Sequence, residues 1–220
     1  MQFENAYKGV KKIFIAELLS ILAAVFVLAA ASMSAFVQLD ATHPLMIATG
    51  ALILVGLGIS IVSFVLKLVG LHQGGRDESR LKIGFYIVIT AIVLTVVSFT
   101  LNIVNGATGG ILTLAINLID TLVDVSKIIL IIYILGGIGN LALSLNDEFM
   151  ANRSRFLINL VAILFVASIL LSFVPSLIGN ANEPLRIIFG VMSIVSALME
   201  LVAYILCVIH YGRAVKMLSK

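Results

Sequence analysis

The sequence contains little of what a soluble or a disulfide-stabilised protein requires. Only 11% of its 220 residues are charged, whereas a soluble domain usually carries about 25%. Cysteine occurs once, at Cys207, so neither a disulfide framework nor a thiolate metal site can form within the chain. Tryptophan is absent, so an aromatic belt at a membrane surface would depend on tyrosines such as Tyr7, Tyr86 and Tyr211. These shortages favour a membrane protein over a soluble one.

Catalytic and nucleic-acid-binding motifs are missing as well. The sequence has no phosphate-binding Gly-Lys loop, no Gly-x-Ser-x-Gly, no Ser-plus-His pair typical of an intramembrane protease and no His-Glu-x-x-His. It has no basic patch with interleaved aromatic residues, so the net charge of +3 does not indicate a nucleic-acid partner. We therefore predict no enzyme activity, no cofactor and no metal, and an intramembrane enzyme is the most distant of the interpretations considered.

What the sequence does have is 61% hydrophobic residues, gathered in repeated runs of 20 or more. A chain of this length cannot bury so much apolar surface within itself, whereas about 20 apolar residues suffice to cross a bilayer. The fold class predicted is all-α: a single polytopic membrane domain over residues 1–220, built from six transmembrane helices in three antiparallel hairpins. The predicted helices span about residues 11–37, 45–71, 82–104, 126–145, 155–174 and 185–211.

The fourth apolar stretch is too long for one crossing. Its pattern runs from Ile111 to Leu145, about 50 Å of helix against a hydrocarbon core of about 30 Å. Residues 111–125 carry polar side chains on one face, which predicts an amphipathic extension that lies on the surface or projects from it. The fifth helix is expected to stop near Pro175.

The distribution of positive charge predicts the orientation, because cytoplasmic loops are enriched in lysine and arginine. Only Lys127 and Arg186 of the fourteen lie toward the opposite side in the predicted topology. Both termini should therefore be cytoplasmic in a multi-pass protein of the cell membrane. The residues assigned to the cytoplasmic side are Lys8, Lys11, Lys12, Lys67, Arg76, Arg80, Lys82, Arg153, Arg155, Arg213, Lys216 and Lys220.

Small and polar residues recur every three or four positions along each helix, forming a seam on one face. In the last helix the seam contains Glu200, about thirteen residues before Arg213 and so near the middle of the membrane. A charged residue at that depth costs about 2.5–3.5 kcal/mol on insertion scales. Glu200 is therefore the first candidate for binding a solute or a proton, and the alternative is interhelical packing.

Five further residues are candidates for the same role. Glu17 and Lys67 lie at similar depths near the inner boundary and could pair, although Lys67 could instead extend toward the cytoplasm. Asp120, Asp124 and Lys127 share one helix face, where Asp124 and Lys127 can pair. This second group would form an outer vestibule for a cation or a polar solute, or simply a solvated helix face.

Two classes of function follow from these patterns. The first is a small-solute transporter or the membrane-embedded substrate-binding subunit of one. In size and helix count the chain is similar to the substrate-binding subunits of energy-coupling-factor transporters, and Ala31-Ser-Met-Ser-Ala35 fits their small-x-x-x-small pattern. That pattern lies at the outer end of the first helix, so the family is not assigned. The second class is a non-transporting scaffold or assembly partner. The partners predicted are the lipid bilayer, a small solute, and a membrane or cytoplasmic protein.

Overall fold

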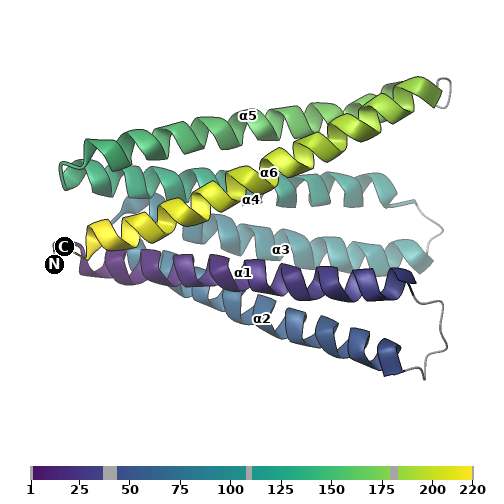
Figure 1. Cartoon of the computed structure of the whole chain (residues 1–220), viewed down its shortest axis with the longest axis horizontal. Helices are drawn as coiled ribbons and strands as arrows, with labels where there is room; N and C mark the ends of the chain where they lie inside the picture. Colours follow the sequence, from purple (N-terminus) through teal and green to yellow (C-terminus); the bar gives the residue numbers. More distant parts are fainter. Residues whose placement is uncertain (1, 37–43, 108–110, 179–182, 220) are drawn as a thin grey trace. The chain divides into compact units, whose positions relative to one another are not determined.

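The computed structural model describes residues 2–36, 44–107, 111–178 and 183–219, and within these ranges every regular element is an α-helix (Figure 1). The turn predicted around Asp40 and His43 lies outside the described residues. The helices are α1 (Glu4–Phe36), α2 (Pro44–Gly74), α3 (Ser79–Ala107), α4 (Thr113–Ser144), α5 (Glu148–Ile178) and α6 (Glu183–Leu218).

Five of these helices contain stretches long and apolar enough to cross a membrane. Each stretch has at least the 20 or so residues that a hydrocarbon core requires. Large apolar side chains such as Leu54 and Phe99 project outward from them, where water would be a poor solvent. The described chain is thus all-helical and has the composition of a membrane-embedded protein. The stretches are Glu4–Met33, Met46–Gly74, Ser79–Gly106, Glu148–Ser168 and Gly190–Leu218.

Most of the helices extend beyond the bounds predicted from the sequence. α1 begins at Glu4 rather than near residue 11, and α6 ends at Leu218 rather than near residue 211. Apolar runs mark the part of a helix that faces lipid, whereas backbone hydrogen bonding continues into the polar ends. The predicted stop near Pro175 is wrong, because α5 continues to Ile178. Helices in membranes tolerate proline where neighbouring groups satisfy the freed carbonyl.

The amphipathic residues 111–125 do not form a separate surface segment. From Thr113 they belong to the same continuous helix as the apolar part, so α4 runs unbroken to Ser144, a length of about 48 Å. Between Ile134 and Ala142 this helix is almost entirely buried. α4 is also the helix not counted among the five apolar stretches above.

The described chain divides into two compact units. Unit 1 consists of residues 1–77 and 211–220, and unit 2 of residues 78–210, so that α6 contributes to both. The single membrane domain expected from the sequence stays a prediction, and each unit is described on its own below.

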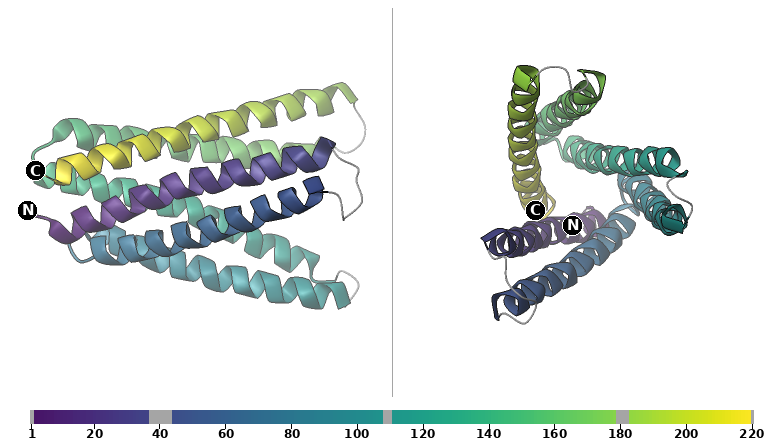
Figure 2. Two further views of the ribbon diagram at one scale, coloured as in Figure 1. Left: turned by 60° about the horizontal axis from the view of Figure 1, so that its bottom comes forward. Right: turned by 90° about the vertical axis from the view of Figure 1, so that its right-hand side faces the viewer.

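Unit 1 contains α1 and α2, which run side by side in opposite directions (Figure 2). They lie close together at Gly9, where a Cβ atom would lie 2.5 Å from the carbonyl oxygen of Gly70. Near the other end, a Cβ atom at Gly56 would lie 3.2 Å from Val27. Small residues at these positions allow the backbones to contact each other directly, which is how helices associate where lipid removes the hydrophobic driving force.

The start of α1 is held by a side chain from beyond the end of α2. Asp77 accepts hydrogen bonds from the backbone N–H of Ala6, at 2.8 Å, and from the side-chain amide of Asn5, at 3.0 Å. The first N–H groups of a helix lack partners within the helix, and a carboxylate there also favours the positive end of the helix dipole. Asp77 thereby fixes the beginning of α1 to the turn that follows α2.

In unit 2, α3 and α4 are antiparallel with one register throughout. Leu81 packs against Gly137, where a Cβ atom would lie 3.0 Å from its side chain. The Asn140 amide donates to Glu78 Oε1 at 3.1 Å. Toward the other end, Ser98 donates to Asp120 at 2.6 Å. From one of these three pairs to the next, the residue number on α4 falls by as much as the number on α3 rises. This is the pattern of an antiparallel helix pair with a constant register.

A tight turn sends the chain from α4 into α5. Asn146 has a φ of 56°, a left-handed conformation common just after a helix end and tolerated by asparagine. The next residue, Asp147, accepts a hydrogen bond from the Met150 N–H at 3.0 Å and so caps α5. α5 then packs on α4 where Ser154 faces Gly139.

Candidate solute-binding pocket

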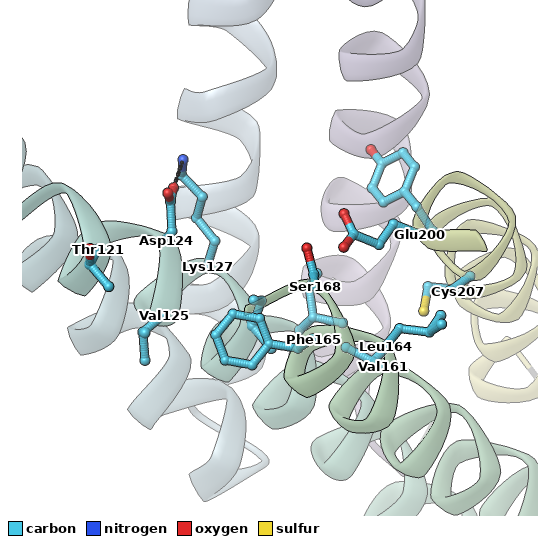
Figure 3. A pocket seen from close by; sticks show the side chains of 14 residues that line it. Thr121, Asp124, Val125, Lys127, Val161, Leu164, Phe165, Ser168, Glu200 and Cys207 are labelled. Atoms are coloured by element: carbon cyan, nitrogen blue, oxygen red, sulfur yellow. Dashed lines mark hydrogen bonds and ion pairs between the residues drawn. The ribbon is translucent and has the colours of Figure 1, made fainter. Parts of the chain in front are cut away.

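A pocket of about 630 Å³ lies between α4, α5 and α6 within unit 2 (Figure 3). Each helix contributes residues at intervals of three or four, which places them on a single face. The size is within the range of sites for small molecules. The lining consists of Thr121, Asp124, Val125, Lys127, Ile128 and Ile131 from α4, Val161, Leu164, Phe165 and Ser168 from α5, and Glu200, Ala203, Tyr204 and Cys207 from α6.

The Glu200 carboxylate is directed from α6 into the pocket, and the Ser168 hydroxyl of α5 points toward it (Figure 3). Glu200 is an exposed residue, and among the described residues no side chain forms an ion pair with it. A carboxylate with no fixed counter-ion in a largely apolar site is available to an incoming group. The geometry therefore suits the binding of a polar or charged solute at this point.

Asp124 and Lys127 line the opposite side of the pocket, on α4 (Figure 3). The sequence predicted that these two side chains can pair, and the structure confirms it with a distance of 2.8 Å from Lys127 Nζ to Asp124 Oδ1. Both side chains are 67% exposed, so the pair contributes little to stability. Because the charges of Asp124 and Lys127 largely cancel, the pair adds little net charge to the pocket.

Asp120 does not join this pocket. Its carboxylate accepts the hydrogen bond of Ser98 on α3, although the two aspartates lie four residues apart on one helix. A helix face is broad enough for two residues at that spacing to contact different neighbouring helices. The three residues predicted as one outer vestibule are therefore divided between a helix contact, at Asp120, and a pocket wall, at Asp124 and Lys127.

Glu17 and Lys67 belong to unit 1, and their predicted pairing is confirmed. Lys67 Nζ lies 2.7 Å from Glu17 Oε1, and the glutamate side chain is only 6% exposed. One turn further along, Ser63 donates to the Ala16 carbonyl at 2.7 Å and lies 2.6 Å from the Ser20 hydroxyl. Because the single Ser63 hydrogen is used on Ala16, Ser20 must donate to Ser63. These polar groups satisfy one another across the α1–α2 contact.

Residues that sequence reasoning did not select also line the pocket. Ser168, Tyr204 and Cys207 lie in the lining beside Glu200, the one residue of the four selected from the sequence. Their signal was the shared spacing: Glu200, Tyr204 and Cys207 lie at intervals of four and three. Which seams face each other depends on how the helices are rotated about their axes, and a single sequence does not reveal this.

A buried Ser–His contact was missed entirely. The Ser154 hydroxyl lies 2.7 Å from His210 Nε2, and the two residues are 1% and 0% exposed. They are separated by 56 residues and follow no recognisable motif, so they could not be paired from the sequence. A nucleophile and a base at hydrogen-bond distance resemble a catalytic pair, but their burial leaves no access for a substrate. We assign this contact to helix packing.

Within the described ranges, no group of three histidine, cysteine or acidic side chains is placed to hold a metal ion. Comparison of the chain with protein-family models, with curated proteins and with solved structures finds no match. The interpretation of the pocket therefore depends on its own chemistry.

Proposed function

We propose that the protein is a six-span membrane protein that binds a small solute in the α4–α5–α6 pocket, as a transporter or as the membrane-embedded substrate-binding subunit of one. The observation that carries this proposal is the Glu200 carboxylate, directed into a pocket of about 630 Å³ with mainly apolar walls. An ionisable residue within a membrane span marks a functional site unless another role is shown.

The proposal includes α4 as the sixth span. Its residues 126–144 carry a single charged side chain, Lys127, and their length matches the hydrocarbon core. Six crossings bring the termini to the same side, which the excess of basic residues at that end identifies as cytoplasmic. The pocket would then lie between the three membrane spans α4, α5 and α6 and not on a part of the protein outside the membrane.

The test measures thermal unfolding of the full chain in detergent with a panel of small amines, carboxylic acids and alcohols. At least one solute should raise the unfolding temperature, and Glu200→Gln should require at least about tenfold more of it for the same shift. Glu148→Gln, at the start of α5 and outside the pocket, is the matched control. If no solute shifts the wild type and Glu200→Leu unfolds at a higher temperature, the carboxylate serves packing and the proposal fails.

The second candidate, a scaffold or assembly partner, is favoured by one observation in unit 1. The described polar side chains between α1 and α2 bond to one another: Glu17 to Lys67, and Ser20 to Ser63. Polar groups engaged in this way hold helices together and need no ligand. This reasoning applies to unit 1, whereas Glu200, which forms no ion pair with the described side chains, lies in unit 2.

A further inference from the structure

The charges that line the α4–α5–α6 pocket do not balance. Asp124 and Lys127 pair with each other at 2.8 Å, which leaves the Glu200 carboxylate as the remaining charge among the described lining residues. The pocket therefore carries a net negative charge of about one. Such a charge favours cations over anions at Glu200, and because Glu200 is exposed, salt in the solvent reduces this preference.

The hydrogen-bonding groups of the lining point to the same class of ligand. The Thr121 hydroxyl donates its hydrogen to the Asn117 carbonyl at 2.8 Å, so toward the pocket it can only accept. Lys127 is the cationic donor of the lining, and it is engaged by Asp124. At Glu200 a ligand carrying N–H donors is complementary to the carboxylate, whereas a carboxylate or phosphate placed there would meet a second negative charge.

Most of the remaining wall is apolar. Val125, Ile128 and Ile131 face Val161, Leu164 and Phe165 from the neighbouring helix. An apolar wall binds an apolar group through burial, and the face of Phe165 can also attract a cation. A fully hydrated ion such as Na⁺ would gain nothing from these residues. The lining is thus complementary to a molecule that is cationic at one end and apolar at the other.

We propose that the pocket selects small organic cations, an ammonium group binding at Glu200 and an apolar body binding between α4 and α5. This inference rests on the proposed function, since it names the class of solute for the same site. An anion of the same shape is rejected by Glu200, and a neutral analogue binds more weakly than the cation because it lacks the charge interaction.

The single cysteine of the chain provides the test, because Cys207 lines the pocket and only 2% of it is exposed. Its thiolate attacks the sulfenyl sulfur of a methanethiosulfonate reagent, which forms a mixed disulfide and releases methanesulfinate. The aminoethyl, methyl and sulfonatoethyl reagents are cationic, neutral and anionic, and each rate on the full chain in detergent is divided by its rate with a small free thiol. The cationic reagent should react at least about tenfold faster than the anionic one.

Three variants isolate the source of this preference. Glu200→Gln should bring the cation-to-anion rate ratio close to one, whereas Lys127→Gln should raise it, because Asp124 then loses its counter-ion. Glu148→Gln should leave it unchanged. Gel filtration and circular dichroism of each variant establish that it folds, and the ratio itself is insensitive to the amount of folded protein.

Reversible binding is measured by protection of Cys207 from the neutral reagent. Phenethylammonium should protect at concentrations at least about tenfold lower than phenethyl alcohol or phenylacetate. Protection by phenylacetate or by the alcohol as good as that by the cation would overturn the assignment of cations while the binding function stands. If neither phenethylammonium nor any other solute of the panel raises the unfolding temperature of the wild-type chain, the proposed function itself fails.

Discussion

At the scale of single residues, the buried ion pair of Glu17 and Lys67 is the most sensitive contact. Glu17 is almost entirely buried, and removing its partner would leave a carboxylate without a counter-ion among apolar side chains. We expect Lys67→Met to lower the free energy of unfolding in detergent by about 3 kcal/mol. Glu17→Leu combined with Lys67→Met should recover most of this loss, since both charges are then absent.

A double-mutant cycle on thermal or SDS-induced unfolding measures this coupling. Lys8→Met is the matched control, because Lys8 pairs with Glu4 at an exposed position and its loss should cost under about 1 kcal/mol. If Lys67→Met and Lys8→Met are equally mild, the ion pair of Lys67 with Glu17 does not stabilise the contact between the helices.

The Ser154–His210 contact gives a second prediction at this scale. Ser154→Ala removes one partner of a fully buried hydrogen bond and leaves a polar ring nitrogen unsatisfied, which costs about 1–3 kcal/mol. Ser144→Ala, on an exposed residue that bonds within its own helix, should be close to neutral. Chemical unfolding of the two variants in the same detergent compares them directly, and equal stability would show that the Ser154 bond is energetically unimportant.

At the scale of helices, glycine determines how closely two of them approach, and the surroundings differ from one glycine to the next. A Cβ at Gly9 would lie 2.5 Å from backbone atoms of Gly70 and Gly74, which cannot move aside alone. At Gly58 nothing lies within 4 Å. Gly9→Ala should therefore destabilise by about 1–3 kcal/mol, whereas Gly58→Ala should be neutral or stabilise by up to about 1 kcal/mol.

Gly136→Ala tests whether a glycine that faces a side chain tolerates a Cβ atom better than Gly9, which faces backbone atoms. A Cβ at Gly136 would meet the end of the Arg80 side chain, which is flexible, so the loss should be smaller than at Gly9. The three alanine variants are compared by unfolding in one detergent. Equal effects at Gly9 and Gly58 would mean that the close approach of α1 and α2 does not contribute to stability.

The six helices of the described residues lie close to the positions predicted from the sequence, because five of the apolar runs are long. The ends of the helices could not be predicted from the sequence. Residues such as Glu4 and Lys8 extend α1 through hydrogen bonding that hydropathy does not reveal. For the pocket, the charge of Glu200 was conspicuous in an apolar run. Its relation to Asp124 and Lys127 depends on the rotation of α4 and α6, which no spacing within one helix determines.

At the scale of the whole molecule, topology is the property to test first. Reporter fusions after Gly75 and after Met150 should give cytoplasmic signals, and fusions after Asp40, Ala107 and Asn180 should give external ones, because basic residues gather at the inner ends. External signals after both Ala107 and Met150 would show that α4 does not cross the membrane and that five spans, not six, cross it.

Unit 1 is made of the first 77 residues and of residues 211–220, and Phe14 of α1 contacts the position of Gly212. During synthesis the opening helix pair is inserted long before its final neighbour emerges from the ribosome. Until then Phe14 lacks this neighbour, and unit 1, which begins before unit 2, is completed after it. A translation arrest just before residue 211 would therefore leave the oldest part of the molecule unfinished.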